Sequence, residues 1–367
     1  MRSSQTEYQP RLDHLRFLAA TLVVAYHYFH RFVPDIAPAN LVLSLLDEGH
    51  TGIGLFMVIS GFIFTQLCLG KDIDYWGFIR SRVIRIYPMF VFGVVLSLLI
   101  STYNYHRNYG LHELIEWLVP FRSSNVPFSD YFAQLWTIWV EFQFYLLFPF
   151  LLVFYRRYGI RYLLLLLLLT FSVRCLVFLD TGSARFISYE TIIGRLDQFL
   201  IGMLAAVIQR KHSVRFAHPA VLLTASLVLM ITIRWFNRAG GATNITTPIW
   251  IFWPLAEGLI WAFFLLSYVN LRLEFPKTLE TVLAKLGEIS FSIYVMHNLV
   301  LAVLAKHIGV ISFIGNPIAD AAITSVIVTM PPVLLLSWLT FSVVEKPFLS
   351  FRKPYLKIMN DAPVNQK

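Results

Sequence analysis

The chain has 367 residues, of which 57% are hydrophobic and only 14% are charged. An ordinary soluble domain carries about 25% charged residues, so this composition excludes a water-soluble globule and indicates an integral membrane protein. The net charge of +9 is typical of basic loops on the cytoplasmic side of a membrane. The sequence contains no recognisable nucleic-acid-binding module, so nucleic acid is not an expected partner.

Ten apolar segments have the length of a transmembrane helix, which needs about 20 predominantly apolar residues. They predict an all-α polytopic fold with spans at 12–33, 50–70, 83–102, 135–156, 161–180, 193–209, 219–236, 249–269, 282–308 and 319–344. The longest connection, 103–134, contains Tyr, Trp and Pro and is expected to pack on the membrane surface. The two cysteines offer neither a disulfide framework nor the spacing of a metal site.

The distribution of Lys and Arg predicts the orientation of these spans. Most of the 30 Lys and Arg residues fall near the two termini and in every second connection, which is the pattern of cytoplasmic segments. Both termini are therefore expected in the cytoplasm. The predicted organisation is a cytoplasmic tail at 1–11, one transmembrane domain at 12–348 and a basic cytoplasmic tail at 349–367. The first apolar stretch has no small-residue cleavage site and is expected to be retained.

The first predicted span carries two ionisable residues, Arg16 and His27. Eleven helical positions separate them, so they share a helix face and lie about 16 Å apart along the axis. Snorkelling of Arg16 to the inner interface and a hydrogen bond of His27 inside the core would explain each residue separately. Their presence on one face favours a functional role, because ionisable residues at membrane depth are functional candidates by default.

Other spans supply further polar residues at membrane depth. Glu141 lies at a depth similar to that of His27, and a carboxylate beside a histidine fixes the ring tautomer, so Glu141 is expected to be the partner of His27. Arg195 and Asp197 either serve the same cavity or pair with other helices. His297 falls mid-membrane in the ninth span, as a cavity residue or as a hydrogen-bonded packing histidine.

Two arginines, Arg82 and Arg85, stand three residues apart at the start of the third span and share a helix face. The planar fork of Arg can bind phosphate bidentately, although two more cytoplasmic charges would also serve membrane orientation. In the second span, glycines flank the region of Ser60 and allow close helix approach or backbone contact with a ligand. The glycines do not form a phosphate-binding loop.

Together these motifs resemble the acyltransferase-3 family of integral membrane acyltransferases, which modify extracytoplasmic sugars. The resemblance runs from Arg11 to about Phe348. Its motifs are Arg16 and His27 in RLDHLRFLAATLVVAYH, Ser60, Gly61 and Phe62 in GLFMVISGF, Arg82 and Arg85 in RVIRIYP, Glu141 in WTIWVEFQFY, His297 in SIYVMH, and Glu345, Lys346 and Pro347. Some members append a soluble hydrolase-like domain where this sequence has a short basic tail, so either another chain or this one is expected to complete the transfer.

The resemblance implies an acyl-CoA donor, usually acetyl-CoA, supplied from the cytoplasm, and a sugar hydroxyl as acceptor on the far side. It also implies an essential histidine in the first span. The predicted topology puts Arg16, Arg82 and Arg85 where the CoA phosphates would enter. His27 is then the general base and Glu141 orients it, while a transient acyl-histidine is the rival mechanism.

The expected protein is thus a multi-pass O-acetyltransferase of the bacterial inner membrane. Its expected partners are membrane lipids, acyl-CoA and a lipid-linked or polymeric glycan of an exopolysaccharide, a lipopolysaccharide O-antigen or a capsule. A proton-coupled secondary transporter also uses intramembrane ionisable residues, but it predicts inverted repeats that the sequence does not show. A scaffolding subunit does not explain Arg16, His27 and Glu141 at membrane depth.

Overall fold

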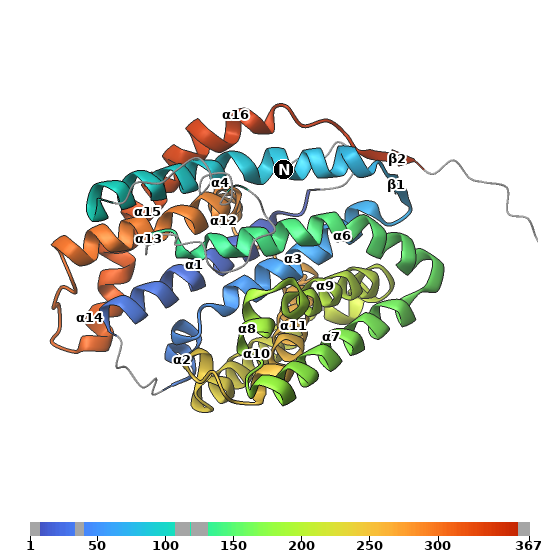
Figure 1. Ribbon diagram of the computed structural model, residues 1–367, viewed down its shortest axis with the longest axis horizontal. Helices are drawn as coiled ribbons and strands as arrows, with labels where there is room; N and C mark the ends of the chain where they lie inside the picture. The colour runs from blue at the N-terminus through green and yellow to red at the C-terminus, as the bar shows by residue number, and fades with distance from the viewer. Residues whose placement is uncertain (1–7, 34–39, 107–117, 119–130, 359–367) are drawn as a thin grey trace, which may run out of the picture.

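Long apolar helices form almost all of the structure, a computed structural model that describes residues 8–33, 40–106, 118 and 131–358 (Figure 1). The helices are α1 (Pro10–Phe32), α2 (Leu41–Asp47), α3 (Thr51–Cys68), α4 (Tyr75–Tyr105), α6 (Trp136–Tyr158), α7 (Ile160–Thr181), α8 (Arg185–Glu190), α9 (Ile192–His212), α10 (Pro219–Arg238), α11 (Ile249–Val269), α12 (Lys277–Glu288), α13 (Ser290–His307), α14 (Pro317–Thr324), α15 (Met330–Thr340) and α16 (Lys346–Leu349). The strands β1 (Lys71–Ile73) and β2 (Leu356–Ile358) pair antiparallel.

The predicted all-α polytopic fold is confirmed. Within the described residues, eight helical elements are long and apolar enough to cross a membrane, and the bent pair of α12 and α13 would make a ninth. One of these elements is the run Pro317–Leu349, in which π-helical turns join α14, α15 and α16. The predicted first span coincides in sequence with α1, which has the length of a span at 23 residues but is not among the elements counted above as apolar enough.

The predicted ninth span, 282–308, is not one straight helix. It covers the end of α12 and all of α13, which meet at an angle of 67°. Close packing accompanies the bend: a Cβ atom on Gly287, near the end of α12, would lie 1.9 Å from the carbonyl oxygen of Asp13 on α1. Because α12 alternates charged and apolar residues, it lies along the surface of the bundle and only α13 continues into its interior.

The centre of the bundle depends on close contact between α3 and α9. A Cβ atom on Gly61 would lie 2.1 Å from the carbonyl oxygen of Phe199, and one on Gly202 would lie 2.2 Å from that of Val58. Only glycine leaves room for two helix backbones at this separation. Helices α1 and α11 pack against the same pair, so residues from the first and second halves of the chain share one core.

The connections described here alternate between two ends of the bundle. At one end, called the basic end, Arg11 donates hydrogen bonds to carbonyls that follow α11, including that of Leu273 at 2.6 Å. Arg156 at the end of α6 lies 3.6 Å from Asp72 in β1. The β1–β2 ribbon brings the C-terminal strand to this same end. The first turn of α1 and β2 therefore lie at the same end of the bundle.

Most of the predicted connection 103–134 lies outside the described residues, at 107–117 and 119–130. Its first residues continue α4 as far as Tyr105. Its last residues form a short 3₁₀ turn, Ala133–Leu135, that leads directly into α6.

Candidate active site

A pocket opens between α1, α3, α4, α6 and α13. It holds about 830 Å³ of space not filled by protein atoms, counting the part that is open to solvent. Its polar lining consists of Arg16, Ser60, Arg82, Arg85, Thr137, Glu141, Tyr145 and Tyr294. Helices far apart in the sequence therefore bring five of the sequence-predicted site residues to one cavity, namely Arg16, Ser60, Arg82, Arg85 and Glu141.

Arg82 lies among aromatic rings. Its guanidinium carbon is 4.9 Å from the ring centre of Phe64 and 6.0 Å from that of Tyr145. One terminal nitrogen donates to the hydroxyl of Ser81 at 3.1 Å, and Nε is buried without a hydrogen-bond partner. Cation–π contacts stabilise a desolvated cation without neutralising its charge. Arg82 therefore keeps its capacity to bind an anion.

Arg85 and Arg16 each have a carboxylate neighbour. Arg85 forms a buried ion pair with Glu345, whose second oxygen accepts a hydrogen bond from Ser292 at 3.0 Å. Nη2 of Arg85 is nevertheless buried without a partner. Arg16 lies 3.7 Å from Asp13 on the preceding turn of α1. The pairing of Arg85 with Glu345 fixes the start of α4 to the end of the last helical run, so the pocket requires both ends of the chain.

Glu141 belongs to the pocket and contacts its other polar residues. It accepts hydrogen bonds from the hydroxyl of Tyr145, one turn further along α6, and from Ser60 at 3.4 Å. The sequence interpretation instead made Glu141 the partner of His27. Equal depth in two helices does not make two side chains face each other, and here the hydrogen bonds of Glu141 turn it toward α3 and its own helix.

The partner of His27 is His297. Nε2 of His297 lies 3.2 Å from Nδ1 of His27, and the ring centres are 4.9 Å apart. His297 follows the pocket-lining Tyr294 by less than one turn of α13, and its side chain is completely buried. The two histidines from α1 and α13 therefore lie together beside the pocket, although neither forms part of its lining.

Backbone carbonyls fix the tautomers of this histidine pair. Nδ1 of His27 lies 2.9 Å from the carbonyl oxygen of Val23, and Nδ1 of His297 lies 2.8 Å from that of Tyr294. A carbonyl only accepts, so each Nδ1 carries the proton. The N–H of His27 is then shared with Nε2 of His297, which accepts. This network assigns Nε2 of His27 as an unprotonated nitrogen, the form that a general base or a nucleophile needs.

Arg195 and Asp197 lie outside the pocket lining and pair with other helices. Asp197 accepts a hydrogen bond from Arg174 on α7 at 2.7 Å, and Arg195 lies 3.3 Å from Glu257 on α11. All four side chains are buried. Of the two roles that the sequence left open for Arg195 and Asp197, the structure shows helix pairing. Their partners lie on other helices, far away in the sequence, so residue spacing within one segment could not have revealed these pairs.

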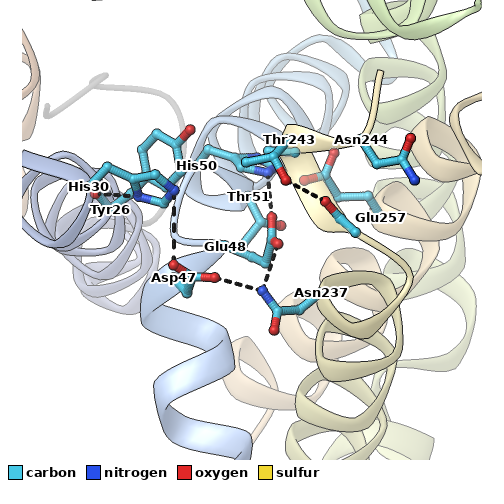
Figure 2. Close-up of polar contacts among 12 residues, drawn as sticks. Tyr26, His30, Asp47, Glu48, His50, Thr51, Asn237, Thr243, Asn244 and Glu257 are labelled. Carbon is cyan, nitrogen blue, oxygen red and sulfur yellow. Dashed lines mark hydrogen bonds and ion pairs between the residues drawn. The ribbon is translucent and has the colours of Figure 1, made fainter. Parts of the chain in front are cut away.

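A second polar cluster, here called the outer cluster, joins Asp47, Glu48, His50 and Asn237 (Figure 2). It lies beside α2, at the end of the bundle away from the β1–β2 ribbon (Figure 1). The ring of His50 is 2.9 Å from Glu48, and the side-chain amide of Asn237 donates to Asp47 at 2.7 Å and to Glu48 at 2.8 Å. Burial alone would raise the pKa of Glu48, but hydrogen bonds from His50 and Asn237 outweigh it and hold that pKa below its usual value. Among the described residues, no group of three or more His, Cys, Asp or Glu side chains could hold a metal ion.

Membrane-length helices around a pocket lined by Arg16, Arg82 and Arg85, with a histidine pair beside it, define a polytopic membrane protein with a cationic pocket among its helices. The sequence profile of the acyltransferase-3 family, described as an acyltransferase domain, matches residues 9–342. The chain therefore belongs to this family, as its motifs indicated.

Several relatives in this comparison carry acetyltransferase names. A protein named as an acetyltransferase from the Acidianus two-tailed virus is 25% identical over 80% of this chain and 84% of its own length. One named as an O-acetyltransferase from Staphylococcus aureus strain MSSA476 is 24% identical over 97% of this chain, which spans 59% of that relative. O-acetyltransferase OatA of Staphylococcus aureus strain NCTC 8325 is 28% identical over 55% of this chain and 35% of its own length. No solved structure matches.

Proposed function

We propose that the protein is a membrane O-acetyltransferase that moves an acetyl group from acetyl-CoA to a sugar hydroxyl of a surface or exported polysaccharide. One observation carries the proposal. The pocket gathers Arg16, Arg82 and Arg85, and the helix that supplies Arg16 also supplies His27 beside the pocket. Family membership and the O-acetyltransferase names of relatives support the same activity.

The pocket arginines would bind the phosphates of the donor. Nε of Arg82 and Nη2 of Arg85 are buried donors without partners in the described part of the chain, and a phosphate would satisfy both with charge-assisted hydrogen bonds. His27 follows Arg16 by eleven helical residues, about 16 Å along α1. That separation suits an extended arm that is held by its phosphates at one end and presents a thioester at the other. The donor would thus bind with its phosphates toward the basic end.

The chemistry follows from the free Nε2 of His27. As general base, this nitrogen takes the proton of the acceptor hydroxyl while the hydroxyl oxygen attacks the thioester carbonyl. The carbon–sulfur bond then breaks, the sugar ester forms, and the CoA thiolate receives the proton. Attack by Nε2 itself would give an acyl-histidine that the sugar then resolves. Both routes need the tautomer that Val23 and His297 hold.

Orientation and location follow from charge. The basic end contains the first turn of α1, the β1–β2 ribbon and Arg156, and positive segments remain on the cytoplasmic side. Both termini would then be cytoplasmic, acetyl-CoA would enter from the cytoplasm, and the acceptor would reach the histidines from the other side. A bacterial inner membrane with an exopolysaccharide, O-antigen or capsule as acceptor fits this arrangement.

The test uses cells that lack the gene and are complemented with wild type, His27→Ala or Arg16→Ala at matched membrane levels. Purified surface polysaccharides are analysed by proton NMR for the O-acetyl methyl signal. We expect the signal with wild type and its loss with His27→Ala, and the linkage identifies the acceptor sugar. Absence of the signal in every strain, with folded protein present, would contradict acetyl transfer to these glycans and favour secondary transport.

A further inference from the structure

The segment that follows the last helical run folds back over the start of α4. Strand β2 pairs with β1, and the backbone N–H of Asp74 donates to the carbonyl of Tyr355 at 2.9 Å. The ring of Tyr355 packs 5.4 Å from that of Phe78, and the guanidinium of Arg82 lies 6.0 Å from the Tyr355 ring centre. Residues of the predicted C-terminal tail therefore form one wall around the pocket arginines.

This fold brings a fourth guanidinium, that of Arg352, beside the pocket. Its Nε and Nη2 atoms are buried and have no hydrogen-bond partner in the described chain. Burial lowers the pKa of Arg352, and the charges of Arg82 and Arg85 lower it further. The site thus holds a desolvated cation next to two other cations, without a carboxylate bonded to it. Such an arrangement is unfavourable unless an anion completes it.

The guanidinium groups of Arg82, Arg85 and Arg352 have one feature in common. Among the described residues, Nε of Arg82, Nη2 of Arg85 and two nitrogens of Arg352 are buried donors without acceptors. Aromatic rings hold the guanidinium of Arg82, and Glu345 holds that of Arg85. Guanidinium donors that have no acceptor are suited to bind a phosphate group.

We propose that Arg352 is a donor-binding residue that contacts a phosphate group of the acyl-CoA together with Arg82 and Arg85, and that the β1–β2 ribbon positions it there. This inference rests on the proposed function, because it assigns the phosphates to CoA. The shared chemistry is a phosphate, and an anionic lipid headgroup could also supply one. The experiment must therefore separate the two sources.

The experiment measures donor binding with purified full-length protein in neutral phosphatidylcholine nanodiscs. Wild type, Arg352→Gln and Arg352→Lys are titrated with CoA and with pantetheine, which lacks all the phosphates. Arg157→Gln is the matched control, because Arg157 lies on the last turn of α6 at the same end and is exposed. Turnover is compared with acetyl-CoA and with S-acetylpantetheine.

We expect Arg352→Gln to weaken CoA binding by about tenfold or more, the loss of a charge-assisted hydrogen bond. Arg352→Lys should weaken it less, because Lys keeps the charge without the fork. Arg352→Gln should raise the KM for acetyl-CoA while the KM for S-acetylpantetheine stays at the wild-type value. Arg157→Gln should match wild type in every measurement.

Four results would overturn the inference. Equal losses with both donors would mean that Arg352 only supports the fold. Wild-type CoA affinity in Arg352→Gln would remove Arg352 from the donor site while the proposed function stands. If that variant instead loses phosphatidylglycerol that wild type retains in native mass spectrometry, the anion is a lipid headgroup. Failure of wild type itself to bind CoA would refute the proposed function, and the inference with it.

Discussion

Nδ1 of His27 and Nε2 of His297 lie 3.2 Å apart, and the carbonyl of Val23 accepts from the same Nδ1 at 2.9 Å. The pair couples α1 to α13 and leaves Nε2 of His27 as the unprotonated ring nitrogen. A buried histidine thus replaces the carboxylate that orients the base in many hydrolases.

We expect His27→Gln to lower turnover by about 10²- to 10⁴-fold, the range for loss of a positioned acid–base group. CoA affinity should remain near that of wild type, because the proposed phosphate contacts are at the arginines and not at His27. The measurement is acetyl transfer by purified protein beside CoA titration. His30→Gln is the matched control, since His30 makes the same contact to the carbonyl four residues earlier, at 3.0 Å, but has no contact with His297. Substantial turnover by His27→Gln would remove His27 from the chemistry.

The contact between α3 and α9 predicts a strong effect of a single methyl group. Gly61→Ala places Cβ where the carbonyl of Phe199 lies 2.1 Å away, so the helices must separate. We expect loss of folded protein or a fall of several degrees in the melting temperature in detergent. Gly93→Ala is the control, because its nearest contact is a side-chain atom of Val295 at 3.2 Å. Equal stability of the two variants would show that α3 and α9 can separate without penalty.

The sequence predicted the helices and the pocket arginines for physical reasons. Apolar segments of membrane length must form helices in lipid, where each backbone group needs an internal partner. Arg16 stands out because it shares a helix face at membrane depth with His27, whereas Arg82 and Arg85 on their own would also serve membrane orientation and gain their meaning from the family motif. Short motifs in family order then indicated the family, which the sequence profile confirms.

The sequence could not predict which side chains face each other across helices. Helix rise gave His27 and Glu141 a common depth, but the rotation of each helix, set by packing, turns His27 toward His297. The bend between α12 and α13 likewise depends on the contact of Gly287 with α1. Arg352 lies in a polar tail without periodicity, and only the pairing of two three-residue strands shows that this tail folds back so that Tyr355 lies beside Arg82.

The buried pair of Arg174 and Asp197 predicts a non-additive mutational effect. Asp197 also accepts from Thr170 at 2.5 Å, and Arg174 also donates to the carbonyl of Ile251 at 2.9 Å. Asp197→Leu leaves a buried guanidinium without its carboxylate, which costs about 3–5 kcal/mol. Combining it with Arg174→Met should recover most of that loss in the free energy of unfolding.

The half-exposed pair of Arg185 and Glu190, at 3.1 Å, supplies the control. Glu190→Gln should change the unfolding free energy by about 0–1 kcal/mol. Reversible unfolding in mixed detergent micelles measures the unfolding free energies of the Asp197 and Arg174 variants and of the Glu190→Gln control. Additive effects of Asp197→Leu and Arg174→Met would show that the two side chains act independently despite their contact.

The outer cluster predicts opposite pH dependences for two adjacent carboxylates (Figure 2). The pKa of Glu48 lies below its usual value in the folded protein, as described above, so its charge stabilises the fold above the unfolded pKa. That contribution is lost as the pH falls through the folded pKa. Burial raises the pKa of Asp47, against an opposing hydrogen bond from Asn237. Its charge therefore opposes folding at neutral pH, and protonation in acid relieves the penalty.

We expect Glu48→Gln to lower the melting temperature at pH 7, with a difference from wild type that shrinks as the pH falls below the ordinary Glu pKa of about 4.3 and through the lower folded pKa. Asp47→Asn should leave the melting temperature at pH 7 unchanged or raise it. Both carboxylates accept from the same amide of Asn237, at 2.7 and 2.8 Å, but only Glu48 also has His50 at 2.9 Å, so the two variants share one contact and differ in their electrostatics. Thermal unfolding between pH 7 and pH 3.5 measures both. A Glu48→Gln penalty that does not vary with pH would show that the hydrogen-bond geometry of Glu48, rather than its charge, stabilises this end of the bundle.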